Sequence, residues 1–243
     1  MNLTSSTILV TGGASGIGLA LAERFAKLGS TVIVCGRRAD VLAEAKKNGL
    51  ETIKADVGKA SDRVALAKEA VERFPKLNVL VNNAGIQRRG AFSEDAASWT
   101  EREEEIAINF AAPAHLAALL IPHLEKQKDA AIVNVTSGLA FVPGVFAPVY
   151  CATKAALHSL SVSLRHDLKR KSIEVIEIIP PQVNTDLGGK GLHDEGVPLA
   201  EFADAMLEGL KRGETEIGYG FSEKARNASR AELDAISARM AQR

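Results

Sequence analysis

The stretch Ile8-Leu-Val-Thr-Gly-Gly-Ala-Ser-Gly-Ile-Gly18 decides how the chain folds, because it joins a short apolar run to a glycine-rich turn. Apolar residues then recur at Ile17, Leu21, Phe25 and Leu28, a spacing typical of a helix. The pattern predicts a strand, a glycine turn and a helix. Glycines let the backbone approach a pyrophosphate, which the N–H groups at a helix start can hold. We expect a dinucleotide site here; a plain tight turn is the alternative.

Strand and helix patterns alternate along the rest of the chain. Apolar, strand-like runs occupy residues 32–35, 52–55, 79–81, 132–135 and 173–179, with a short one near Ile217. Helical spacing dominates the longer segments 99–124, 150–169 and 198–211. Continuous apolar strands suit a parallel sheet buried on both faces. The pattern therefore predicts an α/β fold, a single-domain Rossmann-type doubly wound parallel sheet of about seven strands with helices on both faces.

Bulk properties narrow the class of protein. The 243 residues are 46% hydrophobic and 25% charged, which suits a single globular domain over 1–243. Thirty basic and thirty acidic side chains balance, so we expect no nucleic-acid or membrane partner and a small-molecule substrate instead. The N-terminus lacks a basic, then apolar, leader pattern, which predicts a cytoplasmic protein. Cys35 and Cys151 have no metal-ligand spacing, so no metal site is expected.

The end of the second strand bears on cofactor choice. It reads Gly36-Arg37-Arg38, where an acidic residue would ordinarily bind the adenosine ribose hydroxyl. Guanidinium groups bind phosphate through paired hydrogen bonds. Arg37 and Arg38 therefore favour NADP(H), with NAD(H) less favoured; the alternative is that both simply open a solvated helix.

A second group of residues suggests acid–base chemistry. Tyr150 and Lys154 are four residues apart, so they share one face of a helix. A tyrosine has a pKa of about 10, and a lysine cation beside it stabilises the phenolate, which makes the pair a candidate acid/base. Ser137 follows the strand 132–135, at an end where open α/β sheets bind ligands. Pro113 is expected to bend or break the helix 99–124, and Asn109 lies one turn before it.

Five motifs in this order resemble those of the classical short-chain dehydrogenases/reductases: Thr11-Gly-x-x-x-Gly-x-Gly18, Asn82-Asn-Ala-Gly85, Asn109, Ser137 and Tyr150-x-x-x-Lys154. The resemblance covers the chain from residue 5 to residue 220. The segments 180–185 and 216–222 are similar to the DltE-like subgroup of that family.

The resemblance implies an NADP(H)-dependent oxidoreductase that interconverts a ketone and a secondary alcohol. It makes Tyr150 the general acid/base, with Lys154 lowering its pKa and bonding the nicotinamide ribose. Ser137 would orient the carbonyl, and Asn109 would hold a water in a proton relay to Lys154. The implied cofactor contacts are Gly12, Ser15, Gly16, Ile17, Gly18, Arg37, Arg38, Asp56, Val57, Asn83, Ala84, Gly85, Tyr150, Lys154, Pro180, Val183 and Thr185. A homodimer or homotetramer is also implied.

The chain departs from the family pattern at two positions. Pro181 stands where the family usually has glycine, and because proline fixes φ and lacks an N–H donor, the neighbouring nicotinamide wall is expected to be shaped differently. Ser15 stands where many NADP-preferring relatives carry a basic residue, so a 2′-phosphate would rely on Arg37 and Arg38.

Several segments are candidates for substrate contact. An apolar pocket, suited to a ketone with hydrophobic substituents, is expected from Leu139, Phe141, Val142, Val145 and Phe146. Gln87, Arg88 and Arg89 could engage an anionic group or be ordinary exposed loop residues. The glycine-rich residues 186–197 are expected to form a substrate lid or a surface loop. The helical tail 222–243 is expected to pack on a neighbouring subunit or on its own core.

Two other functions compete with the oxidoreductase. A non-catalytic NADP-binding sensor could share this fold, but it would not need the set Ser137, Tyr150 and Lys154. A hydrolase with Ser137 as nucleophile would need a Gly-x-Ser-x-Gly elbow and a histidine base, and the sequence around Ser137 has no such elbow. The five histidines are expected at helix surfaces or in loops.

Overall fold

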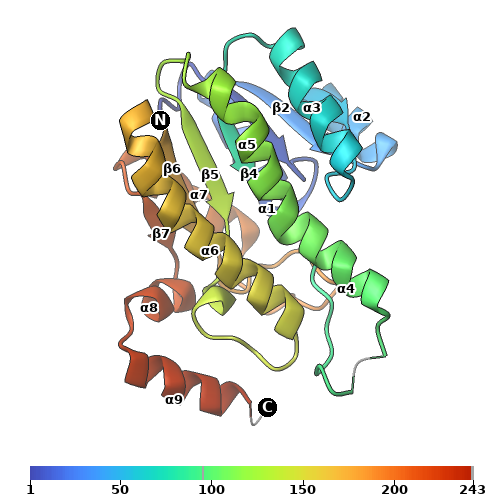
Figure 1. Ribbon diagram of the computed structural model, residues 1–243, viewed down its shortest axis with the longest axis vertical. Coiled ribbons are helices and arrows are strands. Elements are labelled where there is room, and N and C mark those ends of the chain that lie inside the picture. Colours follow the sequence, from blue (N-terminus) through green and yellow to red (C-terminus); the bar gives the residue numbers. More distant parts are fainter. Residues whose placement is uncertain (95, 242–243) are drawn as a thin grey trace.

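The computed structural model describes residues 1–94 and 96–241 (Figure 1). Within them, seven strands form one parallel sheet in the order β3-β2-β1-β4-β5-β6-β7. The strands are β1 (Thr7–Thr11), β2 (Thr31–Gly36), β3 (Glu51–Lys54), β4 (Leu77–Asn82), β5 (Ala131–Val135), β6 (Glu174–Ile179) and β7 (Glu216–Gly218). The prediction of a single Rossmann-type domain with a parallel sheet is confirmed.

Helices cover both faces of this sheet (Figure 1). The face with Ile8 and Val10 packs against α1 (Gly16–Lys27), α2 (Ala39–Lys47) and α7 (Leu199–Lys211). The opposite face, with Leu9, packs against α3 (Ala60–Arg73), α5 (Ala112–Leu124) and α6 (Pro148–Leu168). Because side chains alternate along a strand, one continuous apolar run supplies both cores.

The order of the strands creates the place where a ligand can bind. From β1 the chain builds outward through β2 and β3, then returns to add β4 on the other side of β1. The chain therefore runs toward one edge of the sheet after β1 and toward the other edge after β4. The two connections diverge at the carboxyl ends of these neighbouring strands. Open α/β sheets bind their ligands in the crevice at such a switch point.

The apolar segment 99–124 forms one continuous helix, which is not interrupted at Pro113. It consists of α4 (Trp99–Ile106), a π-helical turn (Ala107–Ala111) and α5, which has Pro113 at its start. The sequence predicted a bend or a break at Pro113; the structure has a local change of winding instead, a π-helical turn directly before α5 that accommodates the missing N–H of proline. By length and composition this helix could cross a membrane. Here Leu116, Leu120 and Leu124 are fully buried against the sheet.

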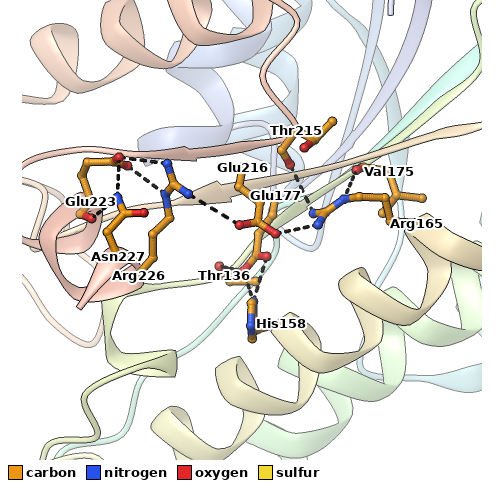
Figure 2. Close-up of polar contacts among 10 residues, drawn as sticks. All are labelled: Thr136, His158, Arg165, Val175, Glu177, Thr215, Glu216, Glu223, Arg226 and Asn227. Carbon is orange, nitrogen blue, oxygen red and sulfur yellow. Dashed lines mark hydrogen bonds and ion pairs between the residues drawn. The ribbon is translucent and has the colours of Figure 1, made fainter. Parts of the chain in front are cut away.

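The tail consists of two helices, α8 (Phe221–Asn227) and α9 (Arg230–Met240), rather than one. Ser222 on α8 is buried and its hydroxyl donates to the backbone oxygen of Ile179, at the end of β6. Figure 2 shows the ion pairs that hold this region: Glu216 on β7 contacts Arg165 of α6 at 2.5 Å and Arg226 of α8 at 3.6 Å. These contacts fix α8 on the body of the domain.

Candidate active site

A cleft of about 1550 Å³ opens at the carboxyl ends of the strands. It exceeds the roughly 300–1,000 Å³ of an ordinary ligand pocket, so it has room for a dinucleotide and a substrate together. Ser137, Tyr150 and Lys154 line it. So do the predicted cofactor residues Gly12, Ser15, Gly16, Ile17, Arg37, Arg38, Asp56, Val57, Asn83, Ala84, Gly85, Pro180, Val183 and Thr185. Gly18 and Asn109, which were also predicted site residues, do not line the cleft.

The glycine loop has the backbone that the sequence predicts. Gly12 and Gly16 have φ angles of 61° and 53°, a region that side chains with a Cβ rarely adopt. A Cβ on Gly12 would lie 2.9 Å from the Cα of Ala84, so the loop packs directly on the segment after β4. At the start of α1, Ser15 makes no capping hydrogen bond and the first turn carries no acidic residue. The N–H groups there remain available to a phosphate.

Gly18 acts through packing and not as a wall of the cleft. A Cβ at this position would lie 2.3 Å from Nδ2 of Asn83 and 2.6 Å from the backbone oxygen of Gly12. Asn83 uses that nitrogen to donate to the backbone oxygens of Thr11, at 3.0 Å, and Gly12, at 3.2 Å. The missing side chain of Gly18 thus lets Asn83 hold the glycine loop in place.

The two arginines after β2 have different surroundings. Nη1 of Arg37 lies 3.3 Å from Glu104 and 4.0 Å from Asp56, so carboxylates already offset its charge. Nη2 of Arg38 instead lies 3.4 Å from the hydroxyl of Ser15, at the start of α1. Arg38, Ser15 and the helix start together form a cradle for a phosphate. The residues present therefore fit NADP(H), with Arg38 better placed than Arg37.

Tyr150 and Lys154 lie on the first turns of α6, which begins two residues earlier than predicted, at Pro148. Both side chains are buried. Nζ of Lys154 is 5.6 Å from the centre of the Tyr150 ring and donates to the backbone oxygen of Val135 at 2.7 Å. Burial lowers the pKa of Lys154 to about 8, against the opposing effect of the Glu177 carboxylate.

The hydroxyl of Tyr150 holds its proton in this structure. Burial raises its pKa well above the ordinary value, and a hydrogen bond with Ser137 opposes this effect only in part. The neighbouring Cys151 and Glu105 add to the effect of burial on this pKa. The role of Lys154 in lowering the pKa of Tyr150 stays a prediction.

Asn109 lies at the π turn and is completely buried. Its Oδ1 accepts from the backbone nitrogen of Ile86 at 2.9 Å, and its Nδ2 donates to the backbone oxygen of Ile86 at 2.8 Å. Nδ2 also donates to the hydroxyl of Thr153 on α6 at 3.2 Å. The side chain thus ties the segment after β4 to α6; its role in a water relay stays a prediction.

The sequence model of the family described as short chain dehydrogenase matches residues 6–196. The chain belongs to this family. It is 49% identical over 247 aligned positions to the uncharacterised oxidoreductase DltE of Bacillus subtilis, covering 99% of this chain and 98% of that protein. This short-chain dehydrogenase is therefore DltE-like, as the sequence indicated.

Solved structures of the family share its fold. A short-chain dehydrogenase from Sphingobium yanoikuyae in complex with NADPH superposes with a TM-score of 0.80 at 28% identity, over 96% of this chain and 93% of that one. An enzyme of the same family from Burkholderia phymatum in complex with NAD superposes with a TM-score of 0.82 at 23% identity, over 96% and 94% of the chains. The family accommodates both cofactors.

Behind the active site of this short-chain dehydrogenase lies a charged pair that the sequence analysis missed. Glu177 interrupts an apolar strand and is fully buried. Its carboxylate accepts from the hydroxyl of Thr136 at 2.6 Å and contacts Nδ1 of His158 at 2.9 Å (Figure 2). His158 lies four residues beyond Lys154, so it continues the face of α6 that carries Tyr150. The sequence did contain a signal for this pair, because Glu177 is a charged residue within the apolar run 173–179.

The apolar wall is smaller than predicted. Leu139, Val145 and Phe146 line the cleft. Phe141 instead contacts His158, with ring centres 4.6 Å apart and the ring planes tilted by 58°, and Val142 is buried in the core. The turn Gly138–Ala140 separates these two groups by redirecting the chain after β5.

Two further parts of the wall come from the tail 222–243 and from the glycine-rich residues 186–197. Ile236, Arg239 and Met240 of α9 line the cleft, although no residue of α9 is buried. The periodicity of the tail indicated a helix but not its partner. His193, from the glycine-rich loop, lines the cleft as well.

Proposed function

We propose that this protein is an NADP(H)-dependent oxidoreductase that interconverts a ketone and a secondary alcohol, with Tyr150 as the general acid/base. The observation that carries the proposal is the sharing of one cleft by Ser137, Tyr150 and Lys154 with the glycine loop and Arg38. A sensor of the NADP pool would have no need of a buried tyrosine and lysine beside the cofactor cradle.

The side chains suit a reaction at a carbonyl oxygen. An oxygen between the hydroxyls of Ser137 and Tyr150 would accept a hydrogen bond from each, which stabilises the negative charge that develops on it. Because the pKa of Tyr150 is raised, its hydroxyl is protonated and can donate to that oxygen. Lys154 is protonated below pH about 8, and its charge favours the phenolate that remains. The bound nicotinamide would supply the hydride.

The preference for NADP(H) over NAD(H) rests on Arg38 and Ser15. Their 3.4 Å contact places a guanidinium group beside the start of α1. A 2′-phosphate there would gain charge-assisted hydrogen bonds that a ribose hydroxyl cannot make to the same extent. The substrate's apolar body would lie against Leu139, Val145 and Phe146.

The proposal is tested by NADPH oxidation with a panel of bulky apolar, small polar and anionic ketones, using Tyr150→Phe as the matched variant. We expect turnover by the unmodified protein and a loss of about a hundred- to ten-thousandfold in Tyr150→Phe, because proton donation contributes about 10²–10⁴-fold to such rates. NADPH binding, followed by its fluorescence, should be unchanged. Undiminished turnover in Tyr150→Phe would refute the assignment of the acid.

Assembly and location belong to the proposal too. α5 and α6 lie side by side on the outer surface of one layer (Figure 1), and Trp99 and Ile106 on the adjoining α4 are exposed apolar residues. We place a homodimer or homotetramer interface on these helices, and the protein in the cytoplasm. Light-scattering mass would reveal a monomer if the interface is absent.

A further inference from the structure

Three polar side chains that line the active-site cleft lack partners for some or all of their polar atoms. His193 is 9% exposed, and neither of its ring nitrogens has a hydrogen bond. Gln87 is 6% exposed, and its buried Oε1 has none either. Arg89, in contrast, is exposed to solvent, and it makes no ion pair with any residue that the structure describes. The unpaired atoms of His193 and Gln87 are buried, and such atoms are rare because leaving each one unpaired costs about 1–3 kcal/mol.

The fold brings two separate segments to this point. The loop 186–197 is closed at its base by the bridge between Val183 and Val197. The other segment follows β4 and contains Gln87 and Arg89. Gly188 of the loop lies against it, since a Cβ on Gly188 would be 3.0 Å from the backbone oxygen of Gln87. Gly90 donates to the backbone oxygen of Phe146 at 2.8 Å, which attaches that segment to the chain just before Tyr150. The three polar residues are therefore held near the catalytic helix.

The charges distinguish Arg89 from its neighbour. Arg88 is neutralised, with its guanidinium group 2.6 Å from Glu104 and 3.6 Å from Glu101. Arg89 instead lies over the ring of Phe146, 4.7 Å from its centre. Burial and the charge of Arg89 both lower the pKa of His193, and the backbone of Leu187, which is near the ring but outside hydrogen-bond geometry, opposes them to a smaller extent. Asp186 and Glu195 also line the cleft, but neither comes within ion-pair distance of Arg89.

This arrangement suits a ligand with an anionic, planar group. A carboxylate can accept two parallel hydrogen bonds from a guanidinium group and one from an imidazole N–H. The amide of Gln87 can add a third donor, because its oxygen and nitrogen are interchangeable by rotation. An anion would also offset the repulsion between Arg89 and a protonated His193.

We propose that Gln87, Arg89 and His193 form a carboxylate subsite, and that the substrate is an oxo acid whose apolar body lies on the wall containing Phe146. The inference rests on the proposed oxidoreductase function and narrows its substrate class. Arg89 and His193 determine specificity in it and take no part in proton transfer.

The experiment compares an aryl oxo acid, 4-oxo-4-phenylbutanoate, with its methyl ester. We expect a kcat/KM at least about tenfold higher for the acid, expressed mainly in KM. Arg89→Leu and His193→Leu should each lower kcat/KM for the acid much more than for the ester, and so remove most of this preference. Arg88→Gln is the matched control and should keep the preference. Equal rates for acid and ester, or equal loss of both in Arg89→Leu, would overturn the subsite.

A binding measurement separates the subsite from the reaction. Calorimetric titration of the acid into the protein with NADP⁺ should show binding that Arg89→Leu weakens at least about tenfold, whether or not the acid is reduced. Binding without turnover of any ketone would refute the proposed function and retain the subsite. No binding, binding unaffected by Arg89→Leu, or tighter binding of the corresponding phosphonate would refute the carboxylate assignment.

Discussion

His158 on α6 and the fully buried Glu177 on β6 form an ion pair, with Nδ1 of the imidazole 2.9 Å from Oε2 of the carboxylate (Figure 2). The carboxylate raises the pKa of His158 and also opposes the lowering of the pKa of Lys154. Because the folded-state pKa of His158 is raised, this pair stabilises the fold fully below the unfolded value of about 6.5 and loses the contribution as pH rises through the folded value.

Glu177→Gln should lower the pKa of both His158 and Lys154, since it removes the negative charge that faces them. We expect the basic limb of the pH–rate profile to move to lower pH and stability to fall by about 1–3 kcal/mol, from weakened buried hydrogen bonds. NMR titration of the His158 ring and the pH–rate profile measure these effects. Glu174→Gln, on the exposed end of the same strand, is the control. A His158 titration unchanged by Glu177→Gln would contradict the interpretation.

Lys154→Met should change how stability depends on pH. The folded-state pKa of Lys154 is about 8 against an ordinary 10.5, so the unfolded chain binds more protons between these values and stability rises with pH there. The unmodified protein should therefore gain about 3 kcal/mol relative to Lys154→Met between pH 7 and pH 10.5. Denaturant unfolding at both pH values tests this. A constant difference would mean that Lys154 titrates normally.

Arg38→Ala should weaken NADPH binding more than Arg37→Ala, because Glu104 and Asp56 already offset the charge of Arg37. A charge-assisted hydrogen bond contributes about 1.5–3 kcal/mol, which predicts about a ten- to hundredfold increase in the Kd for NADPH in Arg38→Ala. Binding of NADH should change little. The reverse ranking of the two variants would assign the 2′-phosphate to Arg37.

Gly18→Ala should destabilise the glycine loop, because the new Cβ would overlap Asn83 and the backbone of Gly12. Overpacking of this kind costs about 1–3 kcal/mol. Gly36→Ala is the control, since no atom outside its immediate neighbours lies closer than 4.0 Å to a Cβ there. Thermal unfolding compares the two. Equal melting temperatures would show that the loop relaxes around the added methyl group.

Truncation after Ala228 removes α9 and leaves α8 docked through Ser222. Because Ile236, Arg239 and Met240 line the cleft, we expect KM for the substrate to rise. Light scattering should give the same number of chains per oligomer as for the full-length protein. Dissociation of the oligomer would instead assign the tail to a subunit interface.

The parallel sheet and the two ligand-binding motifs could be predicted because they are local. The period of the apolar residues defines strands and helices, and the glycines of Gly12–Gly18 define a turn that few other residues allow. The spacing of Tyr150 and Lys154 places both on one helix face wherever that helix packs. None of these conclusions needs contacts between distant parts of the chain.

By itself, the sequence determined the fold class, the family and the residue types at the catalytic positions. Only the tertiary structure decided that Arg38 lies beside Ser15, that Glu177 pairs with His158, and that His193 lies in the cleft. The reason is physical. Propensity and periodicity act over a few neighbouring residues, whereas ion pairs and desolvation depend on which distant segments are packed together.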